Sequence, residues 1–345
     1  MKKVAGLFCL MAAVFIQGQA VPARAAEEYH VIKKIVLGGK GGWDYMKDDS
    51  AQHRLFISRW THVMVLDTRT LKVIGDIPNT LGVHGIALAP KLNRGFISDG
   101  GANQVTIFNL KTLKVTATVK TTGEGPDCIV YDPVTERVFT FNGRSDNSTA
   151  IDAATGKVVG TIALGGRPEY AAADGEGHIY NNLESTSEEL EIDARTLAIL
   201  HRWPLAPGEH PSGLSMDQKH RVLFSGCHNQ KLVIMNANNG HVITTEPIGP
   251  GVDATRFDPE AELAFSSNGG SGTLTIVKED SPTKFHVVEQ LPTELGARTM
   301  ALDPATHRVY LVTAKFGALE PPRPGEHFRR RTIMPGTFTL IVVGP

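Results

Sequence analysis

Ionisable side chains recur at one fixed place in a repeated pattern of this sequence, and this is where chemistry is expected. In seven segments an apolar stretch ends at a turn marked by Asp, Asp-Pro or Ala-Pro, and the residue five positions before that turn residue is polar. One of the seven polar residues is Ser212. The other six are ionisable: Asp44, His84, Asp127, Glu169, Asp253 and Arg298.

Three interpretations of this set follow from the residue types. The carboxylates could hold a divalent cation, with an imidazole nitrogen from His84 or His210. Alternatively, His84 could act as a base on a substrate whose carboxylate is bound by Arg298. The third interpretation is that these are solvated residues at strand ends, which are usually polar. If the carboxylates crowd together, each raises the pKa of its neighbours unless a cation is present.

Further cations occur in the segments that follow the aromatic strand of each unit. The four that could face an acidic rim are Arg59, Arg144, His228 and Lys315. The adjacent pair Cys227-His228 could bind a soft metal ion, although an isolated pair is a weak signal. The sequence has no Cys-x-x-Cys pair, no Gly-x-Ser-x-Gly elbow and no phosphate-binding P-loop. The motifs alone therefore do not decide between binding and catalysis.

An aromatic residue with regular spacing identifies the elements that must position these side chains. It stands six or seven residues after the turn residue, and successive aromatics are separated by 40 to 45 residues. That period is typical of a propeller blade of four short strands. The seven aromatics are Phe56, Phe96, Phe139, Tyr180, Phe224, Phe265 and Tyr310.

Within each unit the third predicted strand ends in Asp or Asn, as at Asp67, Asn109, Asp193 and Asn236. These side chains can accept hydrogen bonds from backbone amides two residues further on, which closes a tight turn before the fourth strand. The last unit lacks a fourth strand, whereas residues 31–39 resemble one at the other end of the chain. We therefore predict an all-β, seven-bladed β-propeller in which the N-terminal strand completes the last blade. The alternative, an open solenoid, would need polar caps at its ends.

The units resemble the YVTN-type repeats of bacterial exported, YncE-like β-propellers. Residues 132–166 and 303–312 carry the resemblance best, whereas the unit around residues 278–282 lacks the Asp or Asn turn. The resemblance extends over nearly all of the chain after the N-terminal segment. It implies an exported propeller but not one activity, because propellers serve binding, cofactor housing and catalysis alike.

The first 25 residues are typical of a secretory signal peptide. A basic start is followed by an apolar stretch over residues 4–16 and by small residues up to Ala25. The apolar stretch is too short to span a membrane, so we expect cleavage, a periplasmic or secreted location and no stable membrane insertion. Residues 26–345 are then a single propeller domain. Without the three basic residues of the signal it has four more acidic than basic residues, which argues against nucleic-acid binding.

The two remaining cysteines and an insertion in the last blade give two further expectations. Cys128 and Cys227 fall in non-adjacent blades, so free and mostly buried thiols are predicted. Residues 315–338 form an insertion in the last blade that is rich in Pro and Arg. Because long loops in compact folds are usually functional or disordered, we predict a lid whose basic side chains face the acidic ring.

These features favour a monomeric, non-catalytic propeller that binds a small molecule, a metal ion or an envelope protein at its channel mouth. The alternative is a metal-dependent enzyme of lactonase or lyase type that uses the carboxylates and His84. A redox domain that houses haem or quinone is a third possibility, disfavoured by the lack of Cys-x-x-Cys-His. The cofactor is not determined by the sequence beyond a candidate divalent cation.

Overall fold

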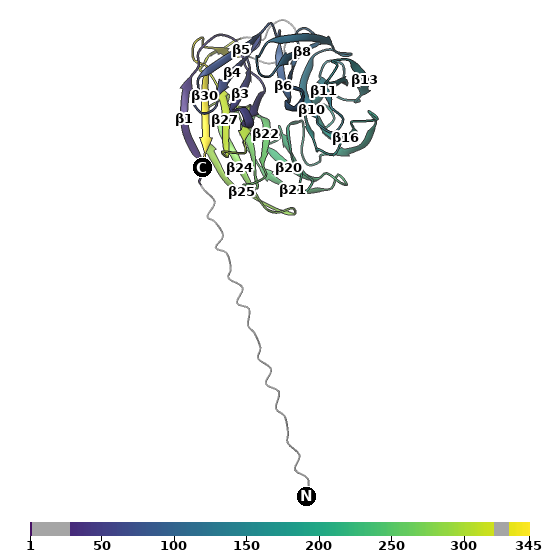
Figure 1. The fold of residues 1–345 in the computed structure, drawn as a ribbon. Helices are drawn as coiled ribbons and strands as arrows, with labels where there is room; N and C mark the ends of the chain where they lie inside the picture. Colours follow the sequence, from purple (N-terminus) through teal and green to yellow (C-terminus); the bar gives the residue numbers. More distant parts are fainter. Residues whose placement is uncertain (2–27, 321–330) are drawn as a thin grey trace.

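The computed structural model describes Met1 and residues 28–320 and 331–345. Across these residues, seven four-stranded antiparallel sheets are arranged in a ring, with one further two-stranded sheet (Figure 1). The predicted seven-bladed β-propeller is therefore confirmed. The predicted signal peptide, residues 1–25, lies almost wholly outside the described residues.

Each of blades 1 to 6 is a continuous stretch of chain whose strands follow one another from the channel outward. Hairpins between consecutive strands give this order because antiparallel neighbours can be joined by short turns. A short 3-10 helix follows the innermost strand in blades 1 and 2: η1 (Ser50–Gln52) and η2 (Pro90–Leu92). The strands of blades 1 to 3 are β2 (Met46–Asp49), β3 (Arg54–Ser58), β4 (His62–Asp67) and β5 (Val73–Pro78); β6 (Val83–Ala89), β7 (Arg94–Asp99), β8 (Gln104–Asn109) and β9 (Val115–Lys120); β10 (Pro126–Asp132), β11 (Arg137–Asn142), β12 (Asn147–Asp152) and β13 (Val158–Ala163).

Blades 4 to 6 repeat this arrangement, with one departure in blade 6. There the third and fourth strands, β24 and β25, are nine residues long and continue past the place where the other blades turn. This explains why the sequence lacks the Asp or Asn turn in that unit. The strands are β14 (Pro168–Ala173), β15 (His178–Leu183), β16 (Glu188–Asp193) and β17 (Ile199–Pro204); β18 (Pro211–Asp217), β19 (Val222–Cys227), β20 (Lys231–Asn236) and β21 (Val242–Pro247); β22 (Val252–Asp258), β23 (Leu263–Asn268), β24 (Thr273–Ser281) and β25 (Lys284–Pro292).

Blade 7 joins the two ends of the chain. Its inner three strands are β26 (Met300–Asp303), β27 (Arg308–Thr313) and β30 (Thr339–Gly344), and its outermost strand is the N-terminal β1 (His30–Val36). β1 pairs antiparallel with β30, from His30 opposite Gly344 to Val36 opposite Thr339. The predicted closure is confirmed, and it removes the two unpaired sheet edges that an open array would expose.

The recurring aromatics form the packing between blades. All seven lie on the second strand of their blade and are at most 1% exposed. The Asp and Asn turns also form as predicted: the amides two residues further on, of Arg69 and Lys111, donate to Asp67 and Asn109 at 3.0 Å each. Cys128 and Cys227 are free and buried, as expected.

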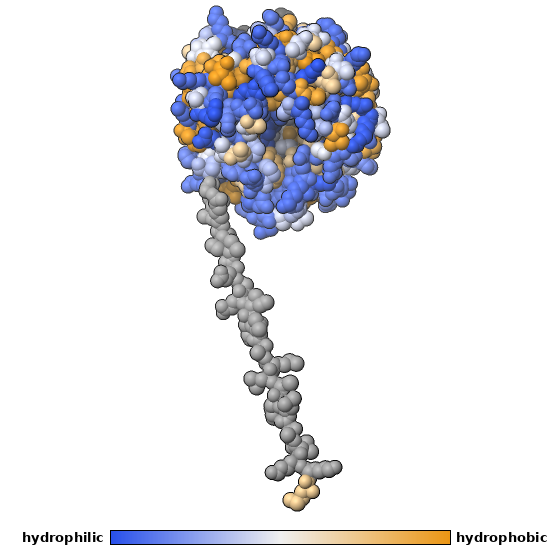
Figure 2. All heavy atoms as spheres, in the orientation of Figure 1, coloured by the Kyte–Doolittle hydropathy of each residue, from blue (hydrophilic) through white to orange (hydrophobic). Residues whose placement is uncertain are grey.

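The innermost strands of neighbouring blades pack side by side around a closed circle, from β2 through β6, β10, β14, β18, β22 and β26 back to β2. Because they run in the same direction relative to the channel, their first residues meet at one opening. In the orientation of Figure 1, hydrophilic residues predominate on the visible face, and the surface is hollowed near its centre (Figure 2). We call the opening at the start of these strands the mouth.

Candidate functional site

The seven positions chosen from the sequence all lie where the innermost strands begin. Five of them, in blades 2 to 6, are the second residue of their strand, and the other two stand two residues before β2 and β26. In blades 2 to 6 the pairing with the second strand shifts register at this place. Such irregularities redirect side chains, here out of the regular ladder at the edge of the channel. We call this set the mouth ring: Asp44, His84, Asp127, Glu169, Ser212, Asp253 and Arg298.

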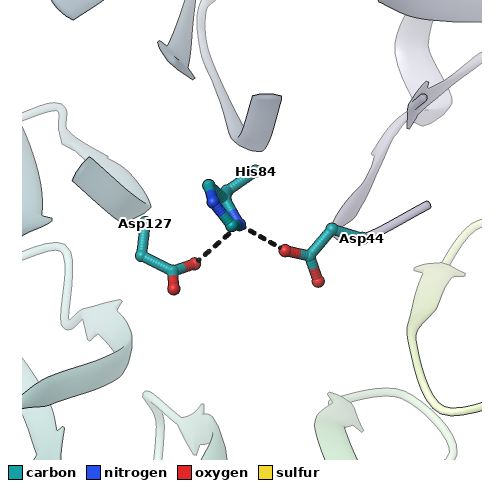
Figure 3. Close-up of side chains that lie close together, drawn as sticks. All are labelled: Asp44, His84 and Asp127. Carbon is teal, nitrogen blue, oxygen red and sulfur yellow. Dashed lines mark hydrogen bonds and ion pairs between the residues drawn. The ribbon is translucent and has the colours of Figure 1, made fainter. Parts of the chain in front are cut away.

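Blades 1 to 3 contribute a histidine between two aspartates. The Nδ1 atom of His84 lies 2.6 Å from Oδ2 of Asp44 and 3.5 Å from Oδ1 of Asp127 (Figure 3). The two carboxylates approach the imidazole from opposite sides. The three side chains are 19 to 34% exposed, so the cluster is in contact with solvent. They could coordinate a metal ion, since their nearest ligand atoms lie within 4.8 Å of one another.

Blades 5 to 7 contribute a second polar group, centred on Arg298. Its Nη1 atom lies 2.5 Å from Oδ2 of Asp253, and its Nη2 atom lies 3.6 Å from Oδ1 of Asp44. Ser212 donates a hydrogen bond from its hydroxyl to Asp253 at 3.1 Å. Arg298 also donates to the backbone carbonyl of Trp43 at 3.2 Å, which joins blade 7 to the start of blade 1.

These contacts change the pKa values of the paired groups. Burial alone would lower the pKa of His84, but the charge of Asp127 and the hydrogen bond to Asp44 raise it to about 9. Burial would raise the pKa of Asp44, yet the hydrogen bond with His84 and the charge of Arg298 hold it below its usual value. At neutral pH, His84 is therefore a cation and Asp44 is an anion.

The remaining carboxylates of the mouth ring are not fully neutralised. Burial and the charges of Asp44 and Asp253 raise the pKa of Asp127 to about 6, although His84 opposes this. Burial and the charges of Asp127 and Asp253 raise the pKa of Glu169 well above its usual value. Burial likewise raises the pKa of Asp253 despite its contact with Arg298. Four carboxylates thus share two cations, and the mouth ring has an excess of negative charge.

Two tyrosines form a floor below the mouth ring. Tyr45 and Tyr170 each follow a residue of the ring, and they come from blades 1 and 4, on opposite sides of the propeller. Their ring centroids are 4.4 Å apart, so the two side chains meet across the channel. Arg256 lies over the Tyr170 ring at 5.3 Å. Beneath them the channel contains a cavity of about 270 Å³, lined by residues of six innermost strands. This floor was not predicted from the sequence, because its two tyrosines stand one residue after the ring positions.

His210 and His228 lie beside the mouth ring, together with Glu184 and Arg167, which were not predicted from the sequence. Nδ1 of His228 lies 3.8 Å from Oε1 of Glu184, and Nδ1 of His210 lies 3.2 Å from the Glu184 backbone carbonyl. Arg167 forms an ion pair with the same carboxylate. Burial lowers the pKa of His228, while the charge of Asp253 opposes this shift. Arg167 and His210 share one offset, two residues before the ring position, and this offset could have identified Arg167.

Arg144 is exposed and links blade 3 to blade 2. Its Nη2 atom donates to the carbonyl of Gly100 at 2.9 Å. Gly100 itself packs against His84, because a Cβ atom there would lie 2.7 Å from the imidazole. Arg144 therefore supports the loop that contacts His84.

Arg59 does not face the acidic mouth, contrary to the expectation from the sequence. Its side chain is 1% exposed, and its guanidinium lies 3.5 Å from the centroid of the Phe338 ring. It donates to the backbone carbonyls of Lys40 at 3.0 Å and Gly42 at 3.2 Å. Backbone carbonyls of the segment that leads into blade 1 accept the hydrogen bonds of the Arg59 guanidinium. Arg59 therefore has a structural role and does not line the mouth.

Lys315 lies at the base of the insertion rather than in the mouth ring. It is exposed, and it lines a surface groove of about 880 Å³ together with Glu294, Phe316 and Arg331. The described parts of the insertion form a hairpin of β28 (Phe316–Leu319) and β29 (Arg331–Ile333). Phe316 packs against Trp43 with ring centroids 6.1 Å apart. Residues 321–330 are outside the described residues, so the lid remains a prediction.

Known proteins similar to this chain identify its fold but not its activity. Antigen Lp49 of Leptospira interrogans is 38% identical over 243 residues, a match that covers 66% of this chain and 53% of that protein. The chain thus spans about half the length of this curated relative. No family model matches the sequence.

Two solved structures share the architecture at low sequence identity. The RRP9 WD40 repeats superpose with a TM-score of 0.75 at 8% identity, covering 92% of this chain and 98% of that one. Hydrazine synthase of Kuenenia stuttgartiensis superposes with a TM-score of 0.70 at 15% identity, covering 78% and 92%. At these identities the likeness extends to the β-propeller fold alone. Among the described residues, no helix is both long and apolar enough to cross a membrane.

Proposed function

We propose that this protein is a non-catalytic binding propeller that captures a small organic cation at its mouth. The observation that carries the proposal is the charge of the mouth ring, where four carboxylates share one arginine and one histidine. Burial and the charges of the neighbouring carboxylates raise the pKa values of Asp127 and Glu169, and a bound cation would relieve the repulsion between them. Tyr45 and Tyr170, which are 7% and 4% exposed, close the floor beneath this site.

The enzyme alternative has weaker support in the geometry. A general base must be unprotonated at the working pH, whereas the pKa of His84 is raised to about 9. Arg298, which would have to hold a substrate carboxylate, is already paired with Asp253 and Asp44. The same protonation of His84 disfavours a metal ion at the mouth, because a metal would have to displace that proton.

We further propose that the protein belongs to the exported YVTN-repeat, YncE-like propellers and acts in the periplasm or outside the cell. This rests on the signal-like N-terminal sequence and on the repeat pattern. The ligand would then be a small molecule of the envelope.

The proposal is tested by calorimetric titration with putrescine and choline, with Mn²⁺ as the metal probe. We expect one of the organic cations to bind, and Asp127→Asn or Glu169→Gln to weaken its binding about tenfold, the equivalent of about 1.4 kcal/mol. Glu124→Gln is the matched control, because Glu124 is an exposed carboxylate three residues before Asp127 and outside the ring. Affinity should also fall below about pH 6, where Asp127 gains a proton.

Three outcomes would contradict this function. One is binding of Mn²⁺ without any organic cation, which would make the mouth a metal site. Another is equal binding by the ring variants and the Glu124 control. The third is turnover of a test lactone that is lost in His84→Gln.

A further inference from the structure

A second histidine lies between two carboxylates, at the seam between blades 5 and 6. Asp217 ends the innermost strand of blade 5, His220 lies in the turn that follows it, and Glu279 is on the third strand of blade 6. The Nδ1 atom of His220 is 2.6 Å from Oδ2 of Asp217 and 3.1 Å from Oε1 of Glu279. We call these three residues the seam cluster.

The two carboxylates of the seam cluster are almost fully buried, and one of their oxygen atoms has no hydrogen-bond partner. Asp217 and Glu279 are each 2% exposed, whereas the His220 side chain is 24% exposed. Oε2 of Glu279 is buried without a hydrogen-bond partner. Buried charges are normally paired, and here a single imidazole faces both carboxylates.

The two adjacent seams have a basic side chain at the corresponding aspartate. Between blades 4 and 5, Nη1 of Arg221 lies 3.1 Å from Asp174. Between blades 6 and 7, Nδ1 of His307 lies 2.8 Å from Asp258. In both seams, the buried aspartate at the end of an innermost strand faces a basic side chain from the next blade. At the seam of blades 5 and 6 the next blade contributes the acid Glu279 instead, so two buried carboxylates face one imidazole.

We propose that Asp217, His220 and Glu279 bind a divalent transition-metal ion of the zinc type, which ties blade 5 to blade 6. Two carboxylates and one imidazole form a mixed oxygen and nitrogen ligand set that suits zinc rather than calcium or magnesium. The ligand atoms lie within 4.8 Å of one another. Zinc bonds of about 2.0–2.1 Å in a tetrahedron separate ligands by about 3.3 Å, so little movement is needed. A water molecule would complete the tetrahedron as fourth ligand.

The site is tested by thermal unfolding of chelator-treated protein with and without Zn²⁺. At a zinc concentration one hundred times the dissociation constant, we expect the wild-type melting temperature to rise by about 5 °C. Glu279→Gln should abolish this rise, and the variant should still fold, because it keeps the side-chain shape and removes a repulsion. His307→Gln, which changes a histidine at the next seam, and Asp127→Asn, at the mouth, should both keep the rise.

Crystals of the wild-type protein soaked in Zn²⁺ give a second readout that needs no variant. An anomalous peak between the three side chains would support the site. The proposal is overturned if the wild-type protein shows no rise and no peak, if Glu279→Gln rises equally, or if only Asp127→Asn loses the rise. The last result would assign the zinc to the mouth.

Discussion

The mouth and the seam cluster use the same residue types and differ in what surrounds them. In each, a histidine Nδ1 atom lies between two carboxylates, at 2.6 and 3.5 Å in the mouth and at 2.6 and 3.1 Å in the seam. The mouth draws its three residues from three blades around an opening, and Arg298 is close by. The seam draws its residues from two blades that pack together, and its acids are almost completely buried.

This comparison shows that burial and neighbouring charge, rather than residue type, determine what such a cluster can do. In the mouth, water and Arg298 screen the carboxylates, so the ring can exist with an excess of charge. In the seam, an uncompensated carboxylate has no access to solvent and must be protonated or bound to a cation. The predictions below test this difference.

Replacement of the histidine should give the largest difference between the two clusters in the free energy of unfolding. In metal-free protein, His220→Ala leaves two buried carboxylates without their partner and should lower the free energy of unfolding by about 3 kcal/mol. His84→Ala removes a partly exposed partner and should cost about 1 kcal/mol. Urea denaturation of both variants measures the two losses. Equal losses would mean that burial does not distinguish the clusters.

Glu279 of the seam and His84 of the mouth should respond to pH in different ranges. Burial and the charge of Asp217 raise the pKa of Glu279 from 4.5 to about 7, so the folded state holds this proton more tightly. In metal-free protein, the free energy of unfolding should therefore fall as pH rises from about 4.5 to 7. The raised pKa of His84 contributes stability that is complete below pH 6.5 and is lost as pH rises through about 9.

Measurement of the free energy of unfolding from about pH 4.5 to 9 tests both predicted falls in stability. Glu279→Gln should reduce the fall between pH 4.5 and 7, to which the raised pKa of Asp127 also contributes, and should leave the alkaline range unchanged. His84→Gln should remove the alkaline fall. A flat profile in the wild-type protein between pH 4.5 and 7 would contradict the charge imbalance assigned to the seam.

The smallest effect is expected for Ser212→Ala in the mouth. The change removes the hydrogen bonds that the hydroxyl donates to the backbone carbonyl and the carboxylate of Asp253, and the carboxylate keeps its contact with Arg298. We expect a loss of about 1 kcal/mol or less in the free energy of unfolding and less than a twofold change in putrescine affinity. A loss as large as that of His220→Ala would show that the mouth is as intolerant of unpaired groups as the seam.

Much of the architecture followed from the sequence because it depends on local periodicity. The spacing of aromatics such as Phe139 and Tyr310 predicted the blades, and the turn residues predicted where strands end. The incomplete last unit and residues 31–39 predicted the closure that β1 and β30 form. The offset from the turn predicted which side chains would reach the mouth, since equivalent positions of a repeat occupy equivalent places.

Contacts between repeats were not predictable in this way. The buried position of Arg59, the acid that Glu279 brings to blade 5 and the meeting of Tyr45 with Tyr170 all join segments of different blades. The sequence by itself determined the number, order and closure of the blades, because each unit's strands and turns follow from neighbouring residues. Only the tertiary structure decided which charges became partners, because the curvature of the ring and close packing bring together side chains that no local spacing relates.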